Sequence, residues 1–200
     1  MDNLNMLLAG PDIALLGAVL TTLLLLAVLG MLVWRRHIKR HQVQRLLGSL
    51  GGIYVRDLII PDGVGGTIQT DFLVLLRGGV LVLDVKNYRG VLFGAENAPL
   101  WSQMVRARSF KFINPLPENT LRVQSLKLLL PNVPVIGRVV FTREGRFPRD
   151  MPMGVSMLDT LAADLGAFAG PASLQYLEAW KRLKAGESSS LVEGAVAESG

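Results

Sequence analysis

Two carboxylates and a lysine on neighbouring apolar segments are the residues of this 200-residue chain best suited to chemistry. Asp84, Val85 and Lys86 directly follow the apolar run Val80–Leu83, and Asp71 lies thirteen residues before Asp84. Side chains alternate along a strand, so Asp84 and Lys86 share one face. Charges inside such a strand cost free energy unless they are paired or bind a metal ion. Two carboxylates suit Mg²⁺, which polarises a phosphoryl oxygen and lowers the pKa of bound water, and a lysine stabilises developing negative charge.

A hairpin is the element expected to position these charges. Thr67–Leu76 and Val80–Lys86 read as strands joined around Gly78-Gly79, because two glycines between strands favour a tight turn. A two-residue turn there places Asp71 opposite Lys86, with the second carboxylate on the diagonal, about 7–8 Å away at the backbone. The opposite face is then wholly apolar, which favours this register over a three-residue turn.

Two interpretations of this pattern stay open on the residues alone. In the first, Asp71 and Asp84 bind a metal ion, and Gln69, one step further along the same face, orients water with its amide. In the second, Asp71 and Lys86 form only a structural ion pair across the sheet, and spacing gives the two interpretations equal weight.

The remaining pattern predicts an α/β sandwich around a mixed sheet. We expect a C-terminal helical region at 151–185 and a mobile tail at 186–200 after a core at 51–150. Residues 95–113 look irregular, with basic residues around Trp101. The expected helices are 37–50, 114–130, 158–168 and 173–184, and the expected strands are 53–60, 67–76, 80–86, 90–93 and 135–141.

The N-terminal region predicts a single membrane anchor at residues 13–34. Ile13 to Val33 contains no charge and would span about 32 Å as a helix. A buried helix and a cleaved signal peptide are the alternatives, but no basic residue precedes the run. Four basic residues in the juxtamembrane helix 35–50 place the C-terminal domain in the cytoplasm and residues 1–12 outside, by the positive-inside rule. They are Arg35, Arg36, Lys39 and Arg40.

Composition adds limits to these predictions. The chain has no cysteine, which excludes disulfides and thiolate metal sites. Its formal net charge of +5 lies largely beside the predicted anchor, where contact with anionic lipid explains it, so net charge argues only weakly for nucleic acid.

Several motifs in order make the chain resemble the nuclease-related domain (NERD) family, over roughly residues 46 to 141. They are Thr67–Asp71, Gly79–Gly90, Trp101, Asn114–Leu116 and Asn119. The resemblance implies a restriction-endonuclease-like mixed sheet of the PD-(D/E)xK type, flanked by helices, that cleaves phosphodiester bonds with Mg²⁺, or with Mn²⁺ in its place. It further implies that Asp71 and Asp84 bind the metal, that Lys86 is catalytic and that Gln69 supports it. No small-molecule cofactor is expected.

Three positions depart from that family pattern. The helix 37–50 lacks the family's acidic residue and has Gln42 and Gln44 in the same region. Phe72 stands where a histidine is common, and Glu118 where a glutamine is common. The first departure removes a negative charge from the metal site, so a carboxylate from elsewhere, such as Asp57, Asp62 or Glu118, would have to replace it.

Basic residues after the site are candidates for contact with nucleic acid. Arg89, Arg106, Arg108 and Lys111 could follow a phosphate backbone, or form a solvated loop face. For Trp101 and Asn114, packing and helix capping are favoured over base stacking and ligand binding. Three hypotheses follow: a membrane-anchored nuclease acting on DNA, an inactive nucleic-acid-binding or protein-interaction module, and a membrane scaffold.

Overall fold

In this computed structural model the structure describes residues 11–186, except for the side chains of residues 11–14 and 32–42. The chain divides into two compact units, residues 1–45 and 46–200. One helix, α2 (Pro11–Ser49), contains all described residues of the first unit and ends in the second. The expected tail from 187 onward and residues 1–10 lie outside the described part.

Helix α2 carries a long apolar stretch. Its large apolar side chains from Leu15 to Met31 are all exposed, with exposed fractions between 48% and 70%. Among the residues whose side chains are described, no helix combines the length and hydropathy needed to cross a membrane. The predicted anchor, 13–34, lies partly outside those residues, and the basic cluster at 35–40 lies wholly outside them.

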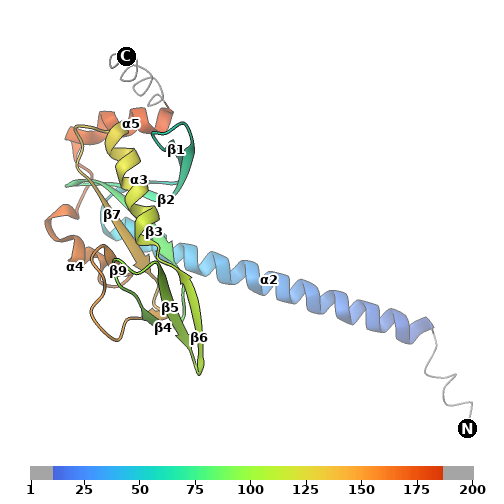
Figure 1. Cartoon of the computed structure of the whole chain (residues 1–200). Coiled ribbons are helices and arrows are strands. Elements are labelled where there is room, and N and C mark those ends of the chain that lie inside the picture. Colours follow the sequence, from blue (N-terminus) through green and yellow to red (C-terminus); the bar gives the residue numbers. More distant parts are fainter. Residues whose placement is uncertain (1–10, 187–200) are drawn as a thin grey trace, which may run out of the picture. The chain divides into compact units, whose positions relative to one another are not determined.

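The described part of the second unit contains two mixed sheets where one was predicted (Figure 1). The first has the order β1-β2-β3-β7-β9, with β1 to β3 antiparallel and β3, β7 and β9 parallel. Its strands are β1 (Ile53–Pro61), β2 (Thr67–Leu76), β3 (Gly79–Lys86), β7 (Val135–Phe141) and β9 (Val155–Met157). The second has the order β6-β5-β4-β8, and consists of β4 (Gly90–Phe93), β5 (Leu100–Val105), β6 (Arg108–Ile113) and β8 (Gly145–Arg146).

Three α-helices follow the β2–β3 hairpin in sequence. They are α3 (Leu116–Leu129), α4 (Leu161–Leu165) and α5 (Leu177–Ala185), with short 3-10 turns at Gly166–Phe168 and Leu174–Tyr176. The predicted helix 114–130 is confirmed, whereas the predicted helix 158–168 is only one turn of α-helix and a 3-10 turn. Gly166 ends α4 with a φ of 52°, which a residue with a side chain rarely adopts.

The main core lies between the first sheet and helices α3 and α5. Alternation along β2 and β3 turns Leu73, Leu75, Val80 and Val82 to this side. The helices contribute Leu126, Leu129, Trp180 and Leu183, all nearly fully buried. Three of the five buried residues of α3 are polar, because Asn119, Arg122 and Ser125 are buried beside Leu126 and Leu129.

Residues 95–113 are not irregular: they contain a β-hairpin that the sequence pattern did not predict. Strands β5 and β6 pair from Leu100–Ile113 to Val105–Arg108, so the turn consists of Arg106 and Ala107. Arg106 has a φ of 55°, a conformation usually signalled by glycine or asparagine. The turn therefore lacks the residues that announce a hairpin.

The predicted register of the β2–β3 hairpin is wrong by two residues. Leu76 pairs with Gly79 and Phe72 with Leu83, so the turn is Arg77-Gly78 rather than Gly78-Gly79. Continuing this register by one residue places Asp71 opposite Asp84, not opposite Lys86. Because side chains alternate with period 2, a shift of two keeps every residue on its predicted face.

Candidate active site

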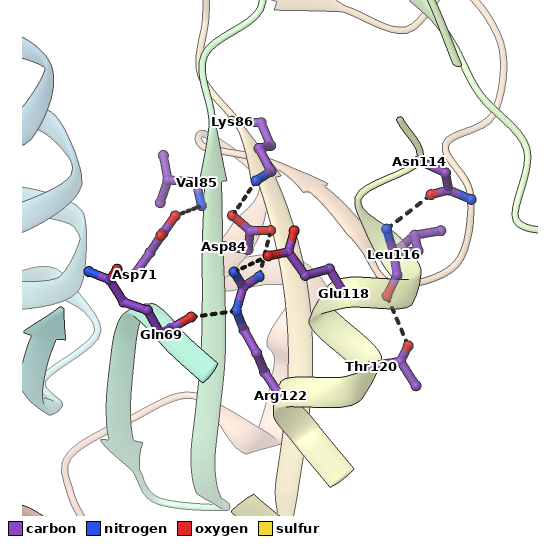
Figure 2. Close-up of polar contacts among 10 residues, drawn as sticks. All are labelled: Gln69, Asp71, Asp84, Val85, Lys86, Asn114, Leu116, Glu118, Thr120 and Arg122. Atoms are coloured by element: carbon purple, nitrogen blue, oxygen red, sulfur yellow. Dashed lines mark hydrogen bonds and ion pairs between the residues drawn. The ribbon is translucent and has the colours of Figure 1, made fainter. Parts of the chain in front are cut away.

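Asp84 is the buried centre of the predicted site. Its side chain is 1% exposed, although it carries a carboxylate. Lys86 Nζ lies 2.9 Å from Asp84 Oδ1, and Arg122 Nη1 lies 3.2 Å from Asp84 Oδ2 (Figure 2). A carboxylate removed from water needs such cationic partners, so these two contacts explain how the strand tolerates it.

Arg122 joins three elements and is the site residue that the sequence analysis missed. From α3, its Nε donates to the backbone carbonyl of Gln69 on β2 at 2.7 Å, and its Nη2 donates to Glu118 Oε1 at 2.7 Å. Arg122 is only 7% exposed. A signal was present: Arg122 lies four residues before Leu126 and seven before Leu129, on the apolar stripe of the helix.

Asp71 lies where β2 separates from β3. The paired ladder ends at Phe72 and Leu83, and beyond it Asp71 Oδ2 accepts a hydrogen bond from the Val85 amide at 3.0 Å. Burial raises the pKa of Asp71 above its ordinary value of 3.8, and the neighbouring Asp84 carboxylate raises it further. The Val85 amide and the Lys86 ammonium lower it. The register and the contact with the Val85 amide place Asp71 beside Asp84, as the metal hypothesis requires.

Gln69 and the three carboxylates that could replace the missing acidic residue lie in different surroundings. Gln69 accepts a hydrogen bond from Arg122 through its backbone carbonyl and is exposed. Asp57 lies 3.8 Å from Arg56, and Asp62 Oδ1 accepts the amides of two loop residues. Glu118 is the substitute that approaches Asp84, but the Arg122 guanidinium lies between the two carboxylates (Figure 2).

The donor set fits a metal held by two carboxylates. Asp84 Oδ1 is buried, and the Lys86 ammonium lies 2.9 Å from it. Across the part of the chain with described side chains, no three histidine, cysteine, aspartate or glutamate residues converge on one point. Mg²⁺ commonly uses only one or two carboxylates, with water and phosphate completing its coordination.

A cleft opens beside the site, between the β5–β6 hairpin and the start of α3. Its volume is about 760 Å³, and Lys86 and Glu118 belong to its lining. Apolar side chains make up much of the remainder, including Tyr88, Ile113 and Leu121. The cleft gives solutes access to the lysine, which is 26% exposed, while Asp84 stays buried.

The packing role predicted for Trp101 is confirmed, whereas the N-cap of α3 is Pro115 and not the predicted Asn114. Trp101 is 1% exposed, packs on Phe141 and donates from Nε1 to the Ala95 carbonyl, so it is not available for base stacking. Asn114 Oδ1 accepts the amide of Leu116 at the start of α3.

The four residues predicted to contact nucleic acid lie outside the site around Asp84. All are exposed residues around the second sheet: Arg89, Arg106, Arg108 and Lys111. Lys111 Nζ lies 2.7 Å from Ser102 Oγ, and Arg106 lies in the β5–β6 turn. A role in binding nucleic acid stays a prediction for this group.

Comparison with known proteins bears on these residues. The sequence model of the nuclease-related domain matches residues 35–142, just over half of the chain. This segment contains Asp71, Asp84, Lys86 and Arg122. An uncharacterized protein of Bacillus anthracis is 30% identical over 112 residues, which is 54% of this chain. The aligned part is 53% of that relative, so the chain spans about half of its length.

Proposed function

Because the chain belongs to the nuclease-related domain family, we propose that it is a metal-dependent nuclease that hydrolyses phosphodiester bonds in DNA. One observation carries the proposal. A buried aspartate lies beside a second carboxylate and 2.9 Å from a lysine that lines an open cleft. Structural ion pairs do not require such an access route.

Each residue has a distinct part in the proposed reaction. Asp71 and Asp84 would hold Mg²⁺, which supplies Lewis acidity toward the phosphate when bound. Lys86 reaches from the cleft to Asp84 and would stabilise the negative charge that develops on the phosphoryl oxygens. Arg122 fixes the Asp84 carboxylate from the opposite side and holds Glu118 near it.

Arg122 also favours a second candidate function, a module that binds nucleic acid without cleaving it. Its guanidinium neutralises Asp84 directly, and the acidic residue that the resemblance implies for helix 37–50 is absent. Both changes weaken the attraction of the site for a divalent cation. In this candidate, the exposed basic residues of the second sheet would supply salt-dependent affinity.

A cleavage assay on the full chain separates the two candidates. DNA is incubated with wild type and with Lys86→Met in the presence of Mg²⁺ or Mn²⁺, and Lys127→Met, an exposed lysine on α3, is the matched control. Hydrolysis that falls at least about 100-fold in Lys86→Met alone supports the nuclease. Binding without hydrolysis, in wild type as in the variant, supports the module and refutes the nuclease.

We also propose that residues 13–34 anchor the chain in a membrane, with the domain on the cytoplasmic face. The uniform exposure of apolar side chains from Leu15 to Met31 supports this proposal, because a helix that is apolar all round needs an apolar environment. Extraction of cell membranes with alkaline carbonate tests it. Release of the chain into the supernatant contradicts the anchor, and protease access from the outside contradicts the orientation.

A further inference from the structure

We propose that the cleft beside Lys86 is a subsite for one unpaired nucleoside of a single-stranded nucleic acid. The inference rests on the proposed function and adds the form of its substrate. With a phosphate at Lys86, the adjoining nucleoside enters the cleft between β6 and α3.

The walls of the cleft suit a flat, partly apolar ring. Ile113 on β6 is 78% exposed and Leu121 on α3 is 55% exposed, and both line the cleft. Tyr88 and Phe112 also line the cleft, and their rings stack with 4.2 Å between centroids and an interplanar angle of 20°. Apolar side chains exposed on two sides of a slot lose contact with water when a ring fills it.

The polar groups at the cleft indicate a ligand that carries both a phosphate and a base. Lys86 supplies the cation for a phosphate, and the carboxylates of Glu96 and Glu118 are acceptors suited to the exocyclic amines of bases. The volume of about 760 Å³ lies within the usual range for small-ligand sites, about 300–1,000 Å³. An apolar peptide would make no use of the lysine, whereas a nucleotide uses both the cation and the apolar walls.

Duplex DNA cannot use this cleft in the same way. Its bases are stacked and paired inside the helix, so a base enters a protein pocket only after it is unpaired and extruded. Unpaired strands pay a smaller cost, and a base that stacks on an aromatic side chain gains about 1–3 kcal/mol. The cleft therefore predicts preference for single strands or for unpaired positions.

Binding of the full chain to matched oligonucleotides tests the subsite. Fluorescence anisotropy compares a single strand with its duplex, with Ca²⁺ in place of Mg²⁺ to prevent cleavage. We expect tighter binding of the single strand. Leu121→Glu and Ile113→Glu should weaken single-strand binding about tenfold and leave duplex binding within about twofold. Leu128→Glu is the control, since Leu128 lies two turns further along α3, is 64% exposed and does not line the cleft.

Specific outcomes overturn the subsite. They are duplex binding as tight as single-strand binding, equal losses for both forms, equal effects of Leu121→Glu and Leu128→Glu, or no binding of either form. Failure of the nuclease is a separate result: single-strand binding that depends on Leu121 without any hydrolysis retains the subsite and refutes the activity. Hydrolysis that depends on Lys86 but not on Leu121 supports the nuclease activity and refutes the subsite.

Discussion

The two sheets of the second unit differ in how their strands are covered. In the first sheet, residues 73–76 of β2 and 80–83 of β3 are at most 1% exposed, so both faces of these strands are buried. In the second sheet, β6 is exposed along nearly its whole length, and Phe110 is 49% exposed. The first sheet can hold charges in fixed positions, whereas the second offers side chains that a ligand can reach.

This contrast assigns different consequences to substitutions in the two sheets. A change at Asp84 on β3 alters packing, charge balance and chemistry together, because its side chain is almost entirely removed from water. A change on β6 alters only what the surface contacts. Stability and binding measurements should therefore separate the two regions.

Loss of Asp84 is expected to have the largest effect. Asp84→Ala leaves two cations, Lys86 and Arg122, without their shared carboxylate, and removing one partner of a buried pair costs about 3–5 kcal/mol. Urea unfolding measures the loss. The control is Asp159→Ala, which breaks an exposed pair with Arg143 and should cost at most about 1 kcal/mol. Equal losses would contradict the contrast.

Replacement of Arg122 by a neutral residue should strengthen metal binding. Arg122→Gln removes a positive charge 3.2 Å from Asp84 Oδ2, so we expect about tenfold tighter Mn²⁺ binding, measured by calorimetry without DNA. Arg122→Lys keeps the charge and is the control. Weaker Mn²⁺ binding in Arg122→Gln would mean that Arg122 orders the carboxylates and does not compete with the ion.

The basic side chains of the second sheet should act on binding alone. Arg106→Gln, Arg108→Gln and Lys111→Gln should each reduce the slope of log affinity against log salt concentration by about one. Their unfolding curves should match wild type, because all three residues are exposed. A fall in stability with no change in salt dependence would mean that these residues stabilise the fold and do not contact nucleic acid.

The smallest effect concerns the ionisation of Asp71 in metal-free protein. Its raised pKa means that the fold favours the protonated form. The resulting stabilisation is complete below the ordinary value of 3.8 and is lost as the pH rises through the folded value. Asp71→Asn should therefore raise the free energy of unfolding at about pH 7, with a difference that shrinks toward about pH 4. A difference that grows toward low pH would reverse the sign of the assigned shift.

The sequence pattern predicted the faces of β2 and β3 but not their register. A shift of two residues does not change the face on which a side chain lies. The pattern therefore predicts Asp71, Asp84 and Lys86 on one face although it misassigns the turn. The place of Arg122 on the apolar stripe of α3 signals that it is buried, but the pattern does not identify its partner. Only the fold shows that this stripe runs past a buried carboxylate, where an arginine is stabilised.

Helix α5 makes the folded unit longer than the segment by which the family is recognised. The family match ends at residue 142, yet Trp180 and Leu183 complete the apolar interior that β2 and β3 begin. A gene fragment cut at the end of the homologous region would encode every proposed site residue and still yield a protein with an open core. Such a fragment should aggregate, and its inactivity would say nothing about the chemistry of the intact chain.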